Sequence, residues 1–546
     1  MVQPLRLAGL AATVAVLGLM SSAWADDVAD ALKARVAAVD GLPVAAANGA
    51  ERSTVVKFYA GRDYKPIWVD DGGVTERARQ VATVLASSAS EGLEPRSYGV
   101  PRIAELLSAK TPAERAELEA LLSLASVSYA SDLASGRLEP AKIDPENYVI
   151  PRDVDEAKVL ADLAETSDPV EYLKHYVPDT PEYIRLRDAL ASYRRIAKTS
   201  RPTVPDGPAI KPGMVDARVP MLRARLVSTG DLAEGAPVGA DLNLYDGTLQ
   251  AAVKHFQIRH GLDIDGAVGK QTIEELNVPV EQRVDQILAN MERRRWMPDN
   301  PGPMYVFVNL ADFQLKVVRD SKTLYTSRVI VGAPYTRTPV FTGRMTYVEV
   351  NPYWVVPPSI AAKEILAAVK RDPGYLAKQR LTVFSGWQAG ADVVDPATIR
   401  WASYSPGTFP YKLRQEPGDG NSLGRIAFMM PNKYNIYLHD TPAKSLFDRA
   451  SRGFSHGCIR VQNPTRLAEV IFRDIEQDPK WTPETLQAAI DTSQNQIVSL
   501  RKPIPVHLAY ITAFANKDGT VHFRRDVYGR DGRLMTLLKT GRQIAQ

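Results

Sequence analysis

The chain has 546 residues, of which 45% are hydrophobic and 24% charged, and its formal net charge is +4. This length predicts several domains with packed cores, and so mild a positive charge gives no reason to expect nucleic-acid binding. After residue 25 no segment is long and apolar enough to predict a transmembrane helix.

Residues 1–25 have the pattern of a secretory signal peptide. Arg6 precedes an apolar run over residues 7–20, and Ala23-Trp24-Ala25 matches the small-x-small cleavage pattern. We therefore expect an exported protein, with an uncleaved N-terminal anchor as the alternative. A lipid anchor is excluded, because no cysteine lies near the cleavage site.

Residues 26–200 predict a helical scaffold. Apolar residues recur at helical spacing over 75–85 and 114–133. No group of residues here suggests chemistry, so packing is the expected role. Residues 201–211 are rich in proline and predict a linker.

A compact unit follows at residues 212–279. Val253 and Phe256 would share one helical face, Asp265-Gly266 predicts a turn, and a short helix should follow Gly269. This spacing resembles the three-helix type of peptidoglycan-binding domain. The resemblance implies either direct contact with glycan strands or a role as a spacer, and the sequence leaves both open.

After a connecting helix at 280–302, the apolar period changes from helical to two, and residues 303–546 predict a mostly antiparallel β domain. Pro357-Pro358 ends the strand pattern, and Ser359 is a candidate cap for a helix running to about residue 371. We expect residues 359–425 to be an insertion of helices and loops, acting as a lid. The predicted fold class is thus multidomain α+β.

The single cysteine, Cys458, lies in the fragment 455–464 (SHGCIRVQNP), two residues after His456, and His439 lies 19 positions upstream. Exported proteins that use cysteine for stability use it in pairs. A lone thiol near histidines therefore suggests a nucleophile activated by an imidazole. A buried inert thiol and a metal site are the alternatives, and the sequence alone does not choose between His439 and His456 as the base.

Several motifs resemble those of the L,D-transpeptidase catalytic domain of the YkuD type, in its large periplasmic branch. These are His439, a gap of fifteen residues and then the run from Ser455 to Arg460; residues 338–341 and 351–360; and residues 417–418 and 421–424. The resemblance implies Cys458 as nucleophile, His439 as general base and proton donor, and the backbone carbonyl of Asp440 as the group that orients His439.

Further site residues are expected from this family resemblance and from the chemistry of their side chains. The amide of Gly457, with that of Cys458, is a candidate oxyanion hole. Arg460 is expected either to bind a substrate carboxylate or to brace the loop. The remaining predicted substrate-binding residues are His456, Ser455, Trp354 and Asn421. No metal or other cofactor is expected.

The implied reaction is 3→3 cross-linking of peptidoglycan stem peptides in the periplasm, through a thioester on Cys458 with release of D-alanine. The expected partners are stem peptides and glycan strands, and carbapenems should acylate Cys458. Water as acceptor would instead give an L,D-carboxypeptidase or endopeptidase. A non-enzymatic wall-binding protein is the third hypothesis.

Overall fold

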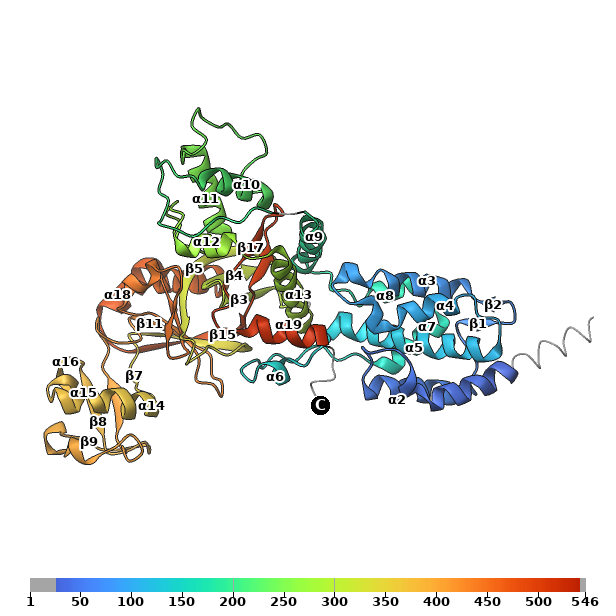
Figure 1. Ribbon diagram of the computed structural model, residues 1–546. Coiled ribbons are helices and arrows are strands. Elements are labelled where there is room, and N and C mark those ends of the chain that lie inside the picture. The colour runs from blue at the N-terminus through green and yellow to red at the C-terminus, as the bar shows by residue number, and fades with distance from the viewer. Residues whose placement is uncertain (1–25, 200, 299, 541–546) are drawn as a thin grey trace, which may run out of the picture.

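The computed structural model describes residues 26–199, 201–298 and 300–540, so the predicted signal peptide at 1–25 lies outside the described residues. Figure 1 shows four parts: a helical scaffold, a small helical unit (α10–α12), a central β domain, and an insertion that projects from the β domain on the side away from the scaffold. The structure is therefore multidomain α+β, as predicted.

The scaffold is built around one long buried helix. This helix, α5 (Pro112–Ser135), begins with a capping box between Thr111 and Glu114, and most of its residues after the first turn are buried. It packs against α2 (Gly49–Ala60), α3 (Glu76–Ala86), α4 (Val100–Leu106) and α7 (Glu156–Glu165). Of the other scaffold helices, α8 (Pro169–Lys174) packs against α3, and α9 (Pro181–Ile196) lies farther along the chain. A two-stranded hairpin, β1 (Val69–Asp70) and β2 (Gly73–Val74), extends from the scaffold.

The small helical unit contains α10 (Val219–Thr229), α11 (Gly247–Arg259) and α12 (Lys270–Leu276). Val253 and Phe256 are buried in its core, as the predicted shared face requires. It is followed by α13 (Val280–Trp296), which packs against scaffold helix α9. This helix joins the small unit to the β domain.

The β domain is a nine-stranded sheet in the order β13-β5-β14-β12-β11-β6-β15-β3-β4, and an additional β4–β5 pairing closes it into a barrel. Three of its pairings are parallel, namely β12 with β14, β13 with β5, and β15 with β3. The bounds are β3 (Met304–Asn309), β4 (Gln314–Arg319), β5 (Lys322–Gly332), β6 (Phe341–Val350), β11 (Ile426–Met429), β12 (Leu438–His439), β13 (Gly453–Ser455), β14 (Ile459–Val461) and β15 (Gln496–Ala509).

Further elements flank the barrel. These are α6 (Pro140–Ile143), α17 (Pro464–Glu469), α18 (Pro483–Asp491), α19 (Arg530–Thr540) and the hairpin of β16 (Ala513–Ala515) with β17 (Val521–Phe523). Among the described residues, no helix has the length and apolar character needed to cross a membrane.

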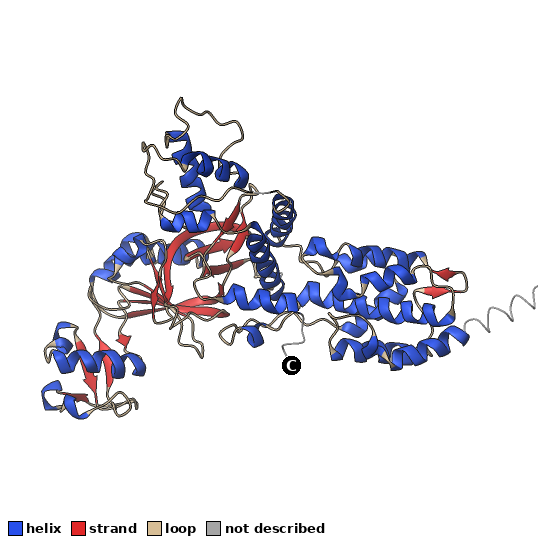
Figure 2. Cartoon of the chain, viewed as in Figure 1, coloured by secondary structure: helices blue, strands red, loops and turns tan. Residues whose placement is uncertain are grey.

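The insertion between β6 and β11 contains more strand than the sequence predicted. It has its own sheet in the order β7-β10-β8-β9, visible as red arrows beside helices in Figure 2. The bounds are β7 (Trp354–Val355), α14 (Pro358–Ile360), α15 (Leu366–Arg371), α16 (Tyr375–Lys378), β8 (Leu381–Phe384), β9 (Val393–Val394) and β10 (Lys412–Gln415). Ser359 is not the helix cap, because Pro357 holds that position and Ser359 lies within α14.

Candidate active site

Cys458 lies in the tight loop between β13 and β14. Gly457 precedes it with φ +119°, a conformation that favours glycine. The Ser455 hydroxyl donates to the Cys458 carbonyl at 2.5 Å and accepts from the Gly457 amide at 3.1 Å. The Thr338 hydroxyl donates to the Gly457 carbonyl at 2.7 Å. The loop that holds the thiol is thus fixed by two hydroxyl groups.

His439 ends β12, which runs parallel to β14 so that His439 pairs with Arg460. Its Nδ1 lies 2.5 Å from the backbone carbonyl of Asp440. A carbonyl can only accept a hydrogen bond, so Nδ1 carries the hydrogen and Nε2 is the acceptor in the neutral ring. This tautomer is the one that a general base needs.

Tyr437 is close to both the thiol and the imidazole. The Ile459 amide donates to the Tyr437 carbonyl at 3.0 Å, which places Cys458 beside Tyr437, and the Tyr437 and His439 rings are 5.7 Å apart between centroids. The Cys458 Sγ donates to the Asn435 carbonyl at 3.4 Å. No hydrogen bond joins Sγ to the His439 ring in the part of the chain that the structure describes.

The pKa shifts indicate that both groups are neutral in this state. Burial raises the pKa of the Cys458 thiol above its ordinary value, although contacts with Tyr437 and the charge of Arg460 oppose the shift. Burial, followed by the charge of Arg460, lowers the pKa of His439 to about 3. The resting pair is therefore thiol and imidazole, and the thiolate has to form when the substrate is attacked.

Arg460 brings a positive charge to this site. Burial lowers the pKa of its guanidinium, while the nearby Cys458 opposes that shift. Its Nε is buried without a hydrogen-bond partner. A buried donor without an acceptor is costly, and a bound carboxylate or oxyanion would supply one. The sequence left two roles open for Arg460, and this geometry favours anion binding.

The carbonyl that orients His439 belongs to a residue that is itself firmly held. The Asp440 carboxylate accepts from the Arg425 amide at 2.9 Å and forms an ion pair with Lys444. Gly424, with φ +62°, packs so closely that a Cβ there would lie 2.3 Å from Cγ of Asp440. A glycine is thus needed beside the residue that fixes the imidazole.

Comparison with known families assigns three parts of the chain. A model of the L,D-transpeptidase catalytic domain (YkuD) matches residues 303–481, a model named "Scaffold domain" matches 53–190, and one named "Putative peptidoglycan binding domain" matches 216–276. The first match includes both Cys458 and His439. Residues 303–481 form an L,D-transpeptidase catalytic domain.

Individual relatives agree with this assignment. A curated protein of Haemophilus influenzae, named "Putative L,D-transpeptidase", is 34% identical over 267 residues, which are 48% of this chain and 52% of that protein. The alignment therefore spans about half of the relative.

Two solved structures were also found, at low similarity. An L,D-transpeptidase from Xylanimonas cellulosilytica is 15% identical, covering 56% of this chain and 99% of that one, with a TM-score of 0.17. A fused Zn-dependent amidase/peptidase/peptidoglycan-binding domain-containing protein from Clostridium acetobutylicum is 13% identical, covering 56% and 100%, with a TM-score of 0.15. TM-scores this low carry no argument about the fold of the L,D-transpeptidase domain.

Three of the residues predicted to bind substrate have other contacts in the L,D-transpeptidase domain. Ser455 is buried, and its hydroxyl is used within the loop. Asn421 is 1% exposed, and its amide group donates to backbone carbonyls, including that of Pro352 at 3.0 Å. Trp354 lies in β7 and packs against the core of the insertion. Neither the Ser455 nor the Asn421 side chain is accessible in this structure, and their contact with substrate stays a prediction.

The predicted oxyanion hole also changes. The Gly457 amide donates to the Ser455 hydroxyl at 3.1 Å, so it is not free to bind an oxyanion. The Cys458 amide makes no hydrogen bond within residues 26–199, 201–298 and 300–540, and it becomes the better candidate.

His456 points toward the insertion of the L,D-transpeptidase domain. Its Nε2 lies 2.7 Å from Oε1 of Glu364, and both side chains are about half exposed. Glu364 belongs to the helical turn Ala361–Ile365. His456 thus links the cysteine loop to the insertion, and it does not orient the thiol.

Sequence reasoning missed Tyr437 and the Asn435 carbonyl. Tyr437 could have been found, because it lies two residues before His439 on an extended run and therefore points to the same face. The Asn435 carbonyl has no such signal, since a backbone group is identical at every position. Only the turn that ends at Ile436 brings it to the thiol.

Proposed function

We propose that this protein is a cysteine-dependent L,D-transpeptidase that forms 3→3 cross-links in peptidoglycan. The observation that carries the proposal is the pairing of β12 with β14 within the matched domain. It brings His439, with its Nε2 free to accept a proton, to the strand that follows Cys458. For proton transfer, Sγ and Nε2 would have to come within hydrogen-bond distance when substrate binds.

The proposed donor step begins when the Cys458 sulfur attacks the carbonyl of the third residue of a tetrapeptide stem. His439 Nε2 accepts the thiol proton. The Cys458 amide stabilises the tetrahedral oxyanion, and Arg460 binds a carboxylate of the stem. The amine of the terminal D-alanine leaves with the proton held by His439, and a thioester remains.

In the acceptor step, the side-chain amine of a second stem attacks the thioester. His439 accepts a proton from this amine and returns it to the sulfur as the thiol leaves. Water has to be kept away during this interval, and the insertion, linked to the cysteine loop through Glu364 and His456, is suited to that role. If water reaches the thioester, the product is a shortened stem, as in an L,D-carboxypeptidase.

The decisive experiment is mass spectrometry of muropeptides after incubation of the purified protein with sacculi rich in tetrapeptides. New 3→3 dimers that are absent with Cys458→Ala and reduced with His439→Gln would support the proposal. Tripeptides without dimers would identify a carboxypeptidase. No change relative to Cys458→Ala would leave only a wall-binding function. Acylation of Cys458 by a carbapenem, seen as a mass increase on the intact protein, is expected.

The remaining parts of the chain fit a cell-wall location. We propose export to the periplasm, consistent with the sequence of residues 1–25, and contact of residues 212–279 with glycan strands. Pull-down of Cys458→Ala protein with sacculi tests the second point. Substitution of the exposed Ile258 and Ile264 by serine should weaken the pull-down if this unit binds glycan, and should leave it unchanged if the unit is a spacer.

A further inference from the structure

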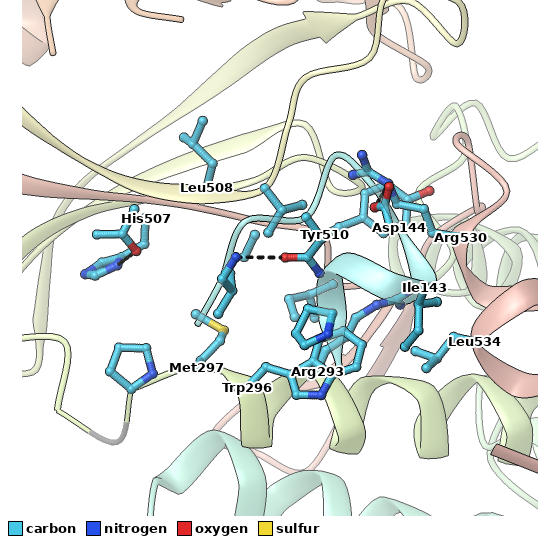
Figure 3. Close-up of a pocket in the computed structure, with 18 residues that line it drawn as sticks. Ile143, Asp144, Arg293, Trp296, Met297, His507, Leu508, Tyr510, Arg530 and Leu534 are labelled. Atoms are coloured by element: carbon cyan, nitrogen blue, oxygen red, sulfur yellow. Dashed lines mark hydrogen bonds and ion pairs between the residues drawn. The ribbon is translucent and has the colours of Figure 1, made fainter. Parts of the chain in front are cut away.

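The scaffold sends one extended segment into the β domain, which we call the brace segment (residues 144–150). It follows α6, and its first residues are fixed to α19. Arg530 Nε lies 2.6 Å from Asp144 Oδ2, and Arg530 Nη2 lies 3.1 Å from Glu146 Oε2. Figure 3 shows Asp144 and Arg530 close together, at the edge of a small cavity between the scaffold and the β domain.

The backbone of the brace segment pairs with the loop between β5 and β6. The Val340 amide donates to the Glu146 carbonyl, and the Tyr148 amide donates to the Val340 carbonyl, both at 2.8 Å. These bonds form a parallel bridge between Asn147 and Val340. Two residues earlier in the same loop, Thr338 donates its hydroxyl to the Gly457 carbonyl. The brace segment is therefore connected to Gly457, the residue before Cys458, through the loop that contains Thr338 and Val340.

A side chain of the brace segment also contacts the turn that precedes β12. The Tyr148 ring stacks on Tyr434 at 4.2 Å between centroids with an interplanar angle of 22°. Phe341 contacts the same Tyr434 ring at 4.9 Å, and the Lys433 ammonium lies 5.4 and 5.3 Å from the centroids of Tyr148 and Tyr434. Stacked and cation–π contacts of this kind restrict the position of a ring.

Tyr434 is adjacent to the residue that holds the thiol. Asn435 has φ +54°, a left-handed conformation that asparagine tolerates, and its carbonyl accepts from Cys458 Sγ at 3.4 Å. The direction of this carbonyl depends on the conformation of the turn over residues 432–436. Within this turn, Tyr434 is the residue whose ring contacts Tyr148 and Phe341. The contacts of Tyr148 thus bear on the acceptor of the thiol hydrogen bond.

We propose that the brace segment positions the nucleophile, with Tyr148 as a positioning residue that fixes the Asn435 carbonyl and through it Cys458. The scaffold domain would then be part of the catalytic apparatus. This inference rests on the proposed function for its effect on turnover, but its effect on the thiol itself can be measured without any substrate.

The expected direction follows from the hydrogen bond. A carbonyl acceptor favours the protonated thiol, so loosening the turn that holds this carbonyl should lower the pKa of Cys458. The same change should misplace the sulfur and slow its attack. The other titratable or charged groups around this thiol are Tyr437, His439, Arg460, Glu349, Lys433, and His456 with Glu364.

The test compares Tyr148→Ala with Tyr148→Phe, which keeps the ring stack, and with Tyr172→Ala. Tyr172 is a suitable control because it contacts Asp162 and Tyr176 within the scaffold. Cys458 is the single cysteine, so the pH profile of iodoacetamide labelling reports on this thiol alone. Dimer formation gives kcat and KM, and thermal unfolding checks the fold.

For Tyr148→Ala we expect a labelling midpoint at lower pH and a kcat reduced about tenfold with little change in KM. Tyr148→Phe and Tyr172→Ala should keep wild-type values. The inference is overturned if Tyr148→Ala retains the wild-type labelling midpoint, or if Tyr148→Phe changes as much as Tyr148→Ala. If the wild-type protein forms no dimers, the proposed function fails, whereas the labelling profile still decides the role of Tyr148.

Discussion

At the scale of single residues, the unusual feature is a nucleophile that is neutral at rest. Burial raises the pKa of Cys458, and burial with the charge of Arg460 lowers that of His439 to about 3. His439 is thus uncharged above about pH 4, and the fraction of thiolate increases as pH rises through the raised pKa of the thiol. The labelling rate of Cys458 should therefore continue to rise beyond the midpoint of an ordinary thiol.

Substitution of Arg460 should show how much its charge opposes this shift. The positive charge favours the thiolate, so Arg460→Gln should move the labelling midpoint of Cys458 to higher pH. It should also slow acylation by a carbapenem, because the anion-binding donor is lost. Arg466→Gln is the matched control, since Arg466 is half exposed and pairs with Glu469. A midpoint equal to that of the wild type would show that Arg460 does not act on the thiol.

Gly424 should be needed for orientation of His439. Gly424→Ala would place a Cβ against the Asp440 side chain at a left-handed φ, and we expect it to lower kcat by about tenfold or more and stability by about 1–2 kcal/mol. Gly420→Ala is the control, because a Cβ at position 420 meets nothing within 4 Å. Measured rates of dimer formation that are equal for the two variants would contradict the role of this contact.

The sequence suggested Cys458 as a nucleophile from its residue type and its histidine neighbours, whereas His439 came from the family resemblance, and the catalytic roles of both stay predictions. The sequence did not indicate that Asn421 and Ser455, which were predicted to bind substrate, are buried and hydrogen-bonded to the backbone. Burial of a polar side chain depends on loops that pack from distant parts of the chain, and a motif does not indicate which side of a loop faces the substrate.

At the scale of elements, the scaffold contains a buried acid. Glu119 of α5 accepts hydrogen bonds from Tyr59 and the Trp68 amide at 2.8 Å and from the Ile67 amide. Burial nevertheless raises its pKa from 4.5 to about 7. A raised carboxyl pKa contributes stability that is fully present below the unfolded value and is lost as pH rises to about 7.

The scaffold should therefore unfold more easily at neutral than at acidic pH. A shift of this size corresponds to about 3 kcal/mol between pH 4.5 and 7.5. Glu119→Gln should remove most of this dependence. Denaturant unfolding followed by circular dichroism at several pH values tests the expectation, with Glu117→Gln as a control at a part-exposed position of the same helix. The hydrogen bond from Arg102 lowers the pKa of Glu117, so this control should leave the dependence between pH 4.5 and 7.5 unchanged. Parallel pH profiles for wild type and Glu119→Gln would refute it.

The apolar periodicity of the sequence predicts long helices and strands better than short ones. Long helices such as α5 and regular strands such as β3 and β4 were predictable from their apolar spacing. The short strands β7 to β10 were not, since strands of two to four residues contain too few positions to show a period. Their pairing partners also lie tens of residues apart, as with Arg414 and Val355.

At the scale of the whole molecule, a buried arginine of the small helical unit, Arg259, is hydrogen-bonded to the β domain. Arg259 of α11 pairs with Asp231 at 2.5 Å, and its Nη1 donates to the Val521 carbonyl of β17 at 2.7 Å. Arg524 donates in return to the Arg259 carbonyl at 2.8 Å. The orientation of this unit relative to the barrel thus depends on few side chains.

Arg259→Ala should weaken this attachment. Removing one partner of a buried ion pair typically costs about 3–5 kcal/mol, and we expect earlier thermal unfolding and faster cleavage by trypsin in the linker at 201–211. Arg223→Ala is the control, since Arg223 also pairs with an aspartate of the unit, Asp246, but forms no bond with the β domain among the described residues. Cleavage at the wild-type rate in both variants would show that Arg259 contributes little to the attachment of the small helical unit to the β domain.

The closure of the sheet into a barrel affects how readily copies of the protein can associate through strand edges. Because β4 pairs with β5, each of the eight strands from β5 to β4 in the ring has a hydrogen-bonded neighbour on both sides. Exposed strand edges are where unrelated chains join into aggregates. Under the proposed function, the protein would often meet other copies of itself along the peptidoglycan network, and its barrel presents almost no unpaired strand edge to them.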